Sequence, residues 1–390
     1  MSRRWFTRLS TVLLLVIAAA AIPRCASPAS ASMPAYCPTG SGTSGDVLCV
    51  RTGTASLASG TLSLTADAAA APTGCGDNAW VVQTRMTSCQ WAPFVVEKRS
   101  VPDGTLVGFI SFTVTSAVTT LGASGPFWNH TFTYVPDFAV GRVGTIELRT
   151  APECWAACGY AGTVQAPSGP ATFTHSAVQV FQTSGTIGSR WTARSDWAFN
   201  FYDPDSINQF TLPARLGYPG HRCDDALPGT SVAGCVQASF KPHLPLSRTD
   251  YPNYKNHIKV AIMPQGSQPN ELTRTTIPAL IAENRDTACP PADAAHPRPA
   301  GYSCDEYPFA TTYQGAFGRA GEGFSLKVNT KFTTIDCKVS WLPTQAQTPF
   351  RGYSACMVPA LENSIGGGEL GEFYRVNRII DGDPFTVLRK

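Results

Sequence analysis

The sequence predicts two domains behind a secretory leader: an N-terminal all-β domain of sandwich type and a C-terminal α+β domain. The chain has 390 residues, more than one hydrophobic core normally serves. Its first half contains several short runs of alternating apolar and polar residues, whereas helical spacing of apolar residues is found only in the second half. We place the leader at residues 1–31, the β domain at 32–205 and the second domain at 220–390.

The leader has three features in the expected order. A basic start, Met1 to Arg8, precedes the apolar run Val12 to Ile22, and Ala29 to Ala31 offers a small-x-small cleavage site. An uncleaved membrane anchor is the alternative, but the apolar run is shorter than the roughly 20 residues that a spanning helix needs. We therefore expect a secreted, extracellular protein with no stable membrane association after cleavage.

The cysteine pattern indicates disulfides. Of 13 cysteines, Cys25 lies in the leader, and an even set remains, which is typical of a secreted chain. These cysteines fall into close successive pairs, so the economical pairing joins neighbours: Cys37 and Cys49, Cys75 and Cys89, Cys154 and Cys158, Cys223 and Cys235, Cys289 and Cys304, Cys337 and Cys356. A zinc site is the alternative, and only Cys154 and Cys158 have ligand-like spacing.

The β domain is predicted from strand-like runs separated by turn residues. The runs begin at Trp80, Phe94, Leu106, His130, Gly144 and Ala177. Short alternating strands without helical segments between them favour an antiparallel sandwich. We expect most of its tryptophans to be core residues, although an exposed aromatic face for a polymer is the alternative. We assign this domain an accessory role in attachment, stability or substrate capture.

The second domain begins after a break rich in Pro, Gly and Asp between residues 202 and 220. Residues 275–285 carry a Thr cap, an early Pro and helical spacing, which predict a short helix. Residues 324–328 and 385–388 are strand candidates. Residues 358–374 are interpreted as a glycine-rich turn that leads into an amphipathic helix with Leu370, Phe373 and Val376 facing the core.

The most informative segment is Gly301 to Ala310, in which Asp305 and Glu306 follow a cysteine and precede an aromatic residue and Pro308. Hydrolysis of a phosphodiester needs a base that activates water and carboxylate or amide oxygens that hold a hard metal ion. Asp305 and Glu306 are candidates for both functions. A solvated turn is the alternative for such a pair.

The glycine-rich segment is a second candidate. A glycine turn at a helix N-terminus presents backbone N–H groups to a phosphate, and Asn363, Glu369 and Glu372 would supply oxygen atoms nearby. The alternative is that Glu369 and Glu372 only complement the helix dipole. His257, on the potentially helical stretch 254–259, and His296 are further candidates, although a lone histidine is more often structural.

Four elements together resemble the NucA/NucB family of secreted bacterial deoxyribonucleases. They are Cys304 to Ala310, Asn363 with the glycines after it, Phe373 with Tyr374, and Arg378 to Phe385. The resemblance covers roughly residues 220–387, and the Asp-Glu-aromatic-Pro block is its most specific part. Tyr307 stands where the family often has Trp, and the three successive glycines align ambiguously.

The resemblance implies a metal-dependent endonuclease that hydrolyses DNA with little sequence specificity. It implies that Asp305 acts as general base and Glu306 as second catalytic residue or metal ligand. Asn363 and Glu372 complete the expected ligand set for a divalent ion, Mg²⁺ or Mn²⁺. DNA is the expected substrate, and an immunity or inhibitor protein is a candidate partner.

Phosphate contacts must be local, because a formal net charge of +3 provides no general basic field. We select Arg285, Arg375 and Arg378 as substrate-binding residues, with Lys255, Lys259 and Arg319 as further candidates. Two alternative functions stay open. The chain could be a nuclease toxin directed at neighbouring cells, or a non-catalytic protein that binds extracellular DNA or cell-wall polymer.

Overall fold

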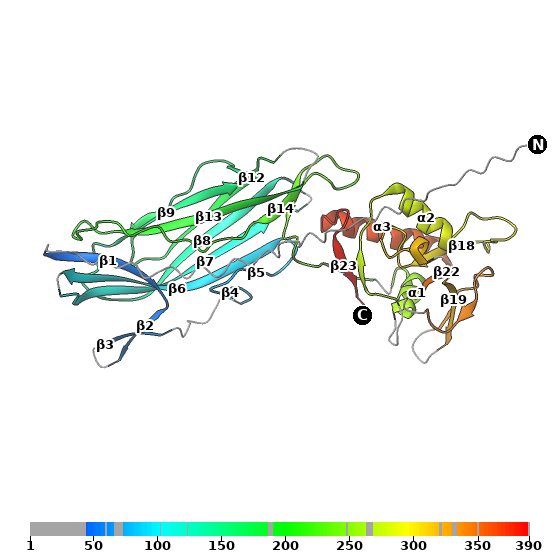
Figure 1. The fold of residues 1–390 in the computed structure, drawn as a ribbon, viewed down its shortest axis with the longest axis horizontal. Helices are drawn as coiled ribbons and strands as arrows, with labels where there is room; N and C mark the ends of the chain where they lie inside the picture. The colour runs from blue at the N-terminus through cyan, green and yellow to red at the C-terminus, as the bar shows by residue number, and fades with distance from the viewer. Residues whose placement is uncertain are drawn as a thin grey trace, which may run out of the picture.

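The computed structural model describes residues 44–58, 61–65, 73–101, 103–122, 124–185, 190–246, 249–262, 268–319, 322–329, 334–348 and 351–388. The predicted leader and Cys37 lie outside these residues. Figure 1 shows two bodies arranged end to end along the long axis. We call the described residues from 44 to 236 the β lobe and those from 237 to 388 the C-terminal lobe.

The larger sheet of the β lobe has eight strands, and β6, β7 and β8 are its long central members (Figure 1). Its strands are β1 (Gly45–Thr52), β4 (Gly76–Asp77), β5 (Val81–Val82), β6 (Thr87–Val101), β7 (Leu106–Thr120), β8 (Phe127–Gly141), β10 (Cys158–Tyr160) and β12 (His175–Thr183). Strands β2 (Thr54–Ala58) and β3 (Thr61–Thr65) form a separate hairpin.

The second sheet of the β lobe has the order β11-β9-β13-β14-β15. Its strands are β9 (Glu147–Ala156), β11 (Ser168–Pro170), β13 (Arg190–Tyr202), β14 (His221–Asp224) and β15 (Gly234–Val236). Strands β14 and β15 belong by sequence position to the segment 220–390 assigned above to the second domain. In the structure β14 pairs with β13, so the sheet of the β lobe continues to Val236.

The two sheets share an aromatic core. Along β8 the side chains of Trp128, His130, Phe132 and Tyr134 are buried, and their neighbours are partly exposed, as expected for a strand with one inward face. Phe132 packs against Trp197 of β13 with ring centroids 5.5 Å apart. This core accounts for most of the tryptophans, but Trp155 is 53% exposed.

The C-terminal lobe contains the three α-helices of the described chain: α1 (Pro252–Ile262), α2 (Pro278–Ala288) and α3 (Ala360–Val376). One sheet is built from β18 (Tyr302–Tyr307), β19 (Gly323–Asn329), β20 (Thr334–Asp336), β21 (Thr344–Gln345) and β22 (Tyr353–Pro359). A smaller sheet contains β16 (His243–Leu244), β17 (Glu271–Thr273) and β23 (Pro384–Val387). The helix predicted at 275–285 and the strands predicted at 324–328 and 385–388 are confirmed, with small shifts.

The predicted fold class is wrong. Strands make up 47% and helices 14% of the residues that the structure describes, so the protein is a mostly β fold with curled sheets, and an α+β C-terminal domain is not supported. The additional strands could not be predicted from the sequence for two reasons. Strand β22 is buried along almost its whole length and shows no alternation. Strands β16, β17, β20 and β21 have only two or three residues, too few for a pattern.

The predicted glycine turn is also wrong. Helix α3 begins at Ala360 and runs through residues 366–368, so the glycine N–H groups lie inside the helix. Tertiary packing outweighs the low helix propensity of glycine here, because Leu370, Phe373 and Tyr374 are buried in the lobe's core. Val376, expected in the core, is 46% exposed.

Five of the predicted disulfides are confirmed: Cys75–Cys89, Cys154–Cys158, Cys223–Cys235, Cys289–Cys304 and Cys337–Cys356. Cys49 is disulfide-bonded as well. The bond between Cys154 and Cys158 removes the alternative of a zinc pair, because a zinc site needs free thiolates. The disulfides fit an extracellular protein. No helix in the described part of the chain is long and apolar enough to cross a membrane.

A buried network of charged residues joins the two lobes. Arg85, just before β6, donates to Asp383 at 2.6 Å, and Arg222 of β14 donates to both oxygens of the same carboxylate at 2.6 and 2.7 Å. Arg378, which follows α3, donates to Asp224 of β14 at 2.9 Å. All of these side chains are largely removed from solvent, and both arginines of the β lobe also donate to the backbone carbonyl of Arg378.

Candidate functional site

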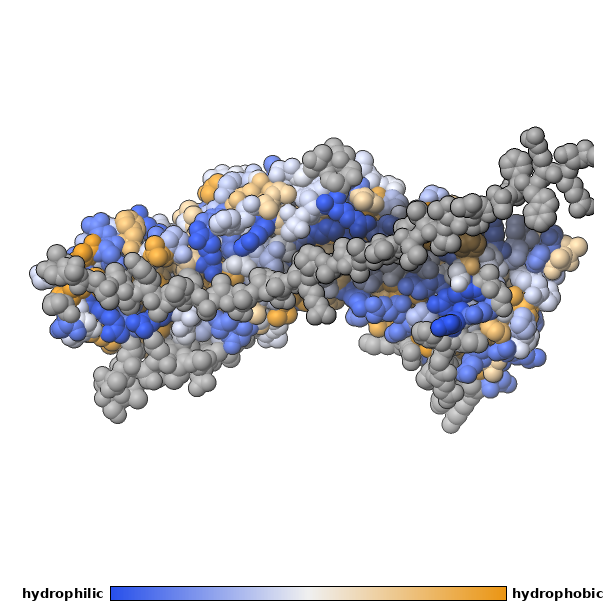
Figure 2. Space-filling view, in the orientation of Figure 1, coloured by the Kyte–Doolittle hydropathy of each residue, from blue (hydrophilic) through white to orange (hydrophobic). Residues whose placement is uncertain are grey.

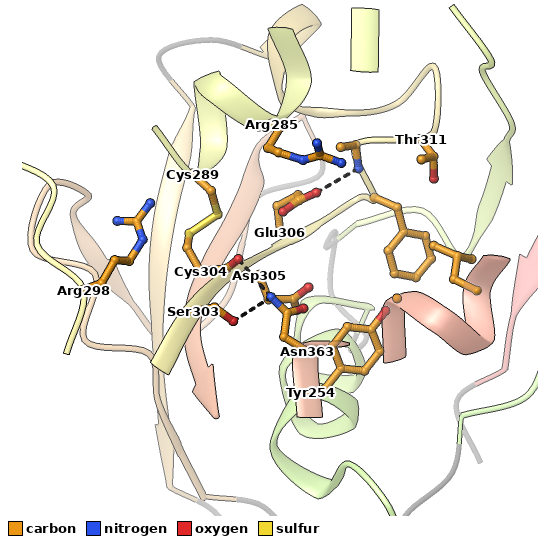
Figure 3. Close-up of a pocket in the computed structure, with 14 residues that line it drawn as sticks. Tyr254, Arg285, Cys289, Arg298, Ser303, Cys304, Asp305, Glu306, Thr311 and Asn363 are labelled. Atoms are coloured by element: carbon orange, nitrogen blue, oxygen red, sulfur yellow. Dashed lines mark hydrogen bonds between the residues drawn. A yellow bond between two sulfur atoms is a disulfide. The ribbon is translucent and has the colours of Figure 1, made fainter. Parts of the chain in front are cut away.

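A pocket of about 430 Å³ opens in the C-terminal lobe, where β18, α1, α2 and α3 meet (Figure 3). It is lined by Tyr254, Arg285, Cys289, Arg298, Ser303, Cys304, Asp305, Glu306, Phe309, Ala310, Thr311, Asn363, Gly367 and Leu370. Three sequence-predicted candidates with side-chain oxygens, Asp305, Glu306 and Asn363, are therefore brought to one pocket. The face in Figure 2 shows apolar side chains in small groups among hydrophilic ones.

Strand β18 carries Asp305 and Glu306 and pairs in antiparallel register with β22, which precedes α3. The disulfide between Cys289 and Cys304 ties the start of this strand to the end of α2. On the other side, Asn363 of α3 donates from Nδ2 to the hydroxyl of Ser303 at 2.9 Å and to the carbonyl of Cys304 at 3.1 Å (Figure 3). These contacts bring the three candidates together.

Asp305 is buried, and its carboxylate contacts a buried histidine. Its Oδ2 lies 2.5 Å from Nδ1 of His257 on α1, and Nε2 of the same ring lies 2.8 Å from the hydroxyl of Ser354 on β22. Burial raises the pKa of Asp305, and the contact with His257 opposes that rise. His257 was only a secondary candidate in the sequence, because no local pattern connects it with a carboxylate 48 positions away.

Ser354, His257 and Asp305 are connected by hydrogen bonds in the same way as the serine, histidine and acid of a hydrolase triad. The burial of Ser354 and His257 argues against that chemistry. Ser354 and His257 are fully buried and do not line the pocket. A serine nucleophile must reach its substrate, so this hydroxyl cannot attack an external bond. Only Asp305 of the three is in contact with the pocket.

Glu306 lines the pocket and is partly buried. One oxygen, Oε1, accepts a hydrogen bond from the backbone N–H of Ala310 at 3.2 Å. Burial raises the pKa of Glu306 to about 8, with a further rise from the charge of Asp305, and the Ala310 N–H and Arg285 act in the opposite direction. Among the described residues, Glu306 has no lysine or arginine at ion-pair distance. The pocket thus holds two neighbouring acids, and its two arginines, Arg285 and Arg298, line it without forming an ion pair with Glu306.

Two acidic candidates on α3 lie elsewhere. Glu372 is exposed and pairs with Arg375 one turn later, at 2.5 and 2.7 Å. Glu369 accepts a hydrogen bond from the hydroxyl of Tyr251. Neither lines the pocket. The pattern of acids along the helix did not reveal its orientation, because α3 is glycine-rich and only weakly amphipathic.

Of the three arginines selected as substrate contacts, only Arg285 lines the pocket. Arg375 pairs with Glu372 on the surface, and Arg378 is buried in the network between the lobes. The sequence did not single out Arg298, which lines the pocket as well. Its guanidinium lies 4.7 Å from the ring centroid of Trp341 and donates to the carbonyl of His296 at 3.1 Å.

Three of the further candidates, Lys255, Arg319 and His296, also have structural partners. Lys255 is buried and donates to the carbonyl of Leu246 at 2.6 Å. Arg319 donates to the carbonyl of Gly352 at 2.9 Å. His296 lies outside the pocket lining and pairs with Asp293 at 2.9 Å.

Tyr254 of α1 forms one wall of the pocket and depends on a glycine in α3. A Cβ atom at position 366 would lie 2.6 Å from the nearest carbon of the tyrosine ring, so only glycine allows the two helices to approach this closely. Burial raises the pKa of Tyr254 well above its ordinary value, and the charges of Asp305 and Glu306 act in the same direction.

Within the part of the chain that the structure describes, two groups of His and Cys atoms lie close enough together to hold a metal ion: His221 with Cys223 and Cys235, and His257 with Cys337 and Cys356. In both groups the two cysteines are bonded to each other. A cystine offers no thiolate, so neither group is a zinc site while its disulfide is intact. The oxygen atoms of the pocket form a different set, suited to a hard cation.

Comparisons with family models, curated proteins and solved structures found no match for this chain.

Proposed function

We propose that the protein is a secreted, metal-dependent endonuclease that hydrolyses DNA with little sequence specificity, as the resemblance to the NucA/NucB family implies. The observation that carries the proposal is the pocket itself. It contains Asp305, Glu306 and Asn363 together, and Arg285 and Arg298 also line it. Metal-assisted hydrolysis of a phosphodiester uses this combination of a base, oxygen ligands for a cation and positive side chains.

The donor set fits a divalent ion such as Mg²⁺ or Mn²⁺. Carboxylate and amide oxygens are the ligands that these hard ions prefer, and Glu306 and Asn363 are the residues that would hold one. Asn363 donates from Nδ2 to β18, which leaves its amide oxygen available as a ligand. When bound, such an ion would offset the negative charge that develops on the phosphate oxygens.

Asp305 is the proposed general base. It accepts a proton from a water molecule as the water oxygen forms a bond to phosphorus, and the bond between phosphorus and the departing sugar oxygen breaks. That oxygen then takes a proton from solvent. Arg285 and Arg298 would bind phosphate oxygens next to the reacting group, and contacts to phosphates carry no direct sequence information. The expected cleavage is therefore tolerant of sequence.

The decisive experiment measures nicking of supercoiled plasmid by the full-length mature protein, with and without a chelator. We expect cleavage that the chelator stops and that Asp305→Asn reduces at least about 100-fold, the lower range for loss of a general base. The thermal melt should stay near wild type, because an asparagine oxygen can still accept from His257.

Glu372→Gln is the matched control. It removes an acid of the same lobe that lies outside the pocket, so cleavage should not change. Plasmid binding without nicking across several divalent metals would refute the proposal and favour the non-catalytic DNA-binding alternative.

A further inference from the structure

His257 has both ring nitrogens occupied and no exposed surface. It comes from α1, contacts Asp305 on β18 and Ser354 on β22, and so connects three elements around the pocket. Ser354 in turn lies 3.5 Å from the carbonyl of Tyr307. The histidine is thus fixed from two sides, and its ring can rotate only if it loses both partners.

The contact with His257 decides which oxygen of Asp305 is available for chemistry. Oδ2 lies 2.5 Å from Nδ1 of His257, which is the one side-chain hydrogen bond of this carboxylate among the described residues, and the backbone N–H of Glu306 also donates to the carboxylate. Asp305 itself lines the pocket, next to Asn363 in Figure 3. A carboxylate held by these two contacts presents its remaining lone pairs in a fixed direction.

We propose that His257 is a positioning residue for the general base: its Nδ1–H holds Oδ2 of Asp305 so that Oδ1 faces the water to be activated. The inference rests on the proposed nuclease function. A different interpretation is a histidine that merely satisfies buried polar groups. The two interpretations differ in which ring nitrogen matters, because only Nδ1 contacts the base.

Two substitutions separate the nitrogens. Asparagine carries its amide nitrogen at the same number of bonds from Cα as Nδ1, so His257→Asn keeps a donor toward Asp305 and loses the contact with Ser354. Glutamine carries its nitrogen at the distance of Nε2, so His257→Gln can reach Ser354 and loses the donor toward Asp305. Both remove the ring, so both leave a similar void in the core.

The experiment measures kcat and KM for plasmid cleavage, together with thermal melts, for the full-length wild type and both variants. We expect kcat of His257→Asn within a few-fold of wild type and kcat of His257→Gln lower by about 100-fold, as for a catalytic group displaced by about 1 Å. KM and the melting temperatures of the two variants should be similar. Ser354→Ala, which keeps the contact between His257 and Asp305, should retain most of kcat.

The outcomes distinguish the two proposals. A wild-type chain that nicks no DNA refutes the nuclease function, and the positioning role with it. A wild-type chain that nicks DNA while the Asn and Gln variants have equal kcat refutes the positioning role alone. If either variant does not fold, ¹⁵N NMR of the wild-type imidazole decides: a bare, unprotonated Nδ1 overturns the inference, and an Nδ1–H that is lost in Asp305→Ala, which removes its acceptor, supports it.

Discussion

For the cation site proposed above, the raised pKa of Glu306 should make cation binding depend strongly on pH. A carboxylate binds a divalent ion in its ionised form, so proton and metal compete for the same oxygens. With a pKa of about 8, the ionised fraction of Glu306 is about 1% near pH 6 and about 50% near pH 8. We therefore expect the apparent affinity for Mn²⁺ to rise about 50-fold across this range, or about 2.3 kcal/mol, and to level off above it.

Calorimetric titration of Mn²⁺ into the full-length protein at three pH values measures this slope. Glu306→Gln cannot ionise at this position, so it should bind weakly and lose most of the pH dependence. Asp305→Asn removes the charge that adds to the raised pKa of Glu306. Its binding curve should therefore shift to lower pH. An affinity that changes less than about three-fold in wild type, or an equal slope in Glu306→Gln, would contradict the reasoning.

The cation-free protein should show the linked effect on stability. The pKa of Glu306 in the fold lies above its ordinary value of 4.5, so between these two values the folded state binds more protons than the unfolded state. The contribution of Glu306 to the stability of the fold is present below pH 4.5 and is lost as the pH rises to about 8. In chelator, the melting temperature of wild type should fall more over this window than that of Glu306→Gln. Added Mn²⁺ should reverse the loss, most strongly at the alkaline end.

Two further predictions test the packing around the pocket and between the lobes. Gly366→Ala places a Cβ about 2.6 Å from the Tyr254 ring, so overpacking should lower the free energy of unfolding by about 1–3 kcal/mol. Gly368→Ala, with open space around it, should instead gain up to about 1 kcal/mol of helix propensity; equal melts would refute the close contact. Arg378→Met leaves Asp224 buried with one partner fewer, and chemical denaturation should reveal a loss of about 3–5 kcal/mol. A loss within error would indicate that Arg378 is not buried as described.

Sequence patterns predicted the features that depend on residues close together in the chain. The alternation along β7 and β8 is visible because each strand has one buried face. The neighbouring cysteines paired as expected, because each pair closes a short loop. The adjacent acids Asp305 and Glu306 were noticed because their sequence neighbours are unusual.

The remaining features depend on tertiary packing and were missed for that reason. Arg298 reaches the pocket from a loop, and its contacts with the Trp341 ring and with the carbonyls of Pro290 and His296 fix its direction. The glycines of α3 suggested a turn, although the core residues after them hold a helix. Ser354 lies on a strand that is buried on both sides, where no periodicity marks the side chain that will face His257.

The charged network between the lobes has a practical consequence for anyone who wishes to study the pocket in isolation. A fragment that starts after Val236 would lack Arg85 and Arg222, the two guanidinium groups that neutralise Asp383. The fragment would also lack Asp224, so the guanidinium of Arg378 would lose its buried carboxylate partner. Strand β23, which begins right after Asp383, would lose these contacts at its start and keep only its pairing with β16 and β17. The C-terminal lobe is therefore not expected to fold correctly on its own. Because of the charged network between the lobes, activity should be assayed on the entire chain.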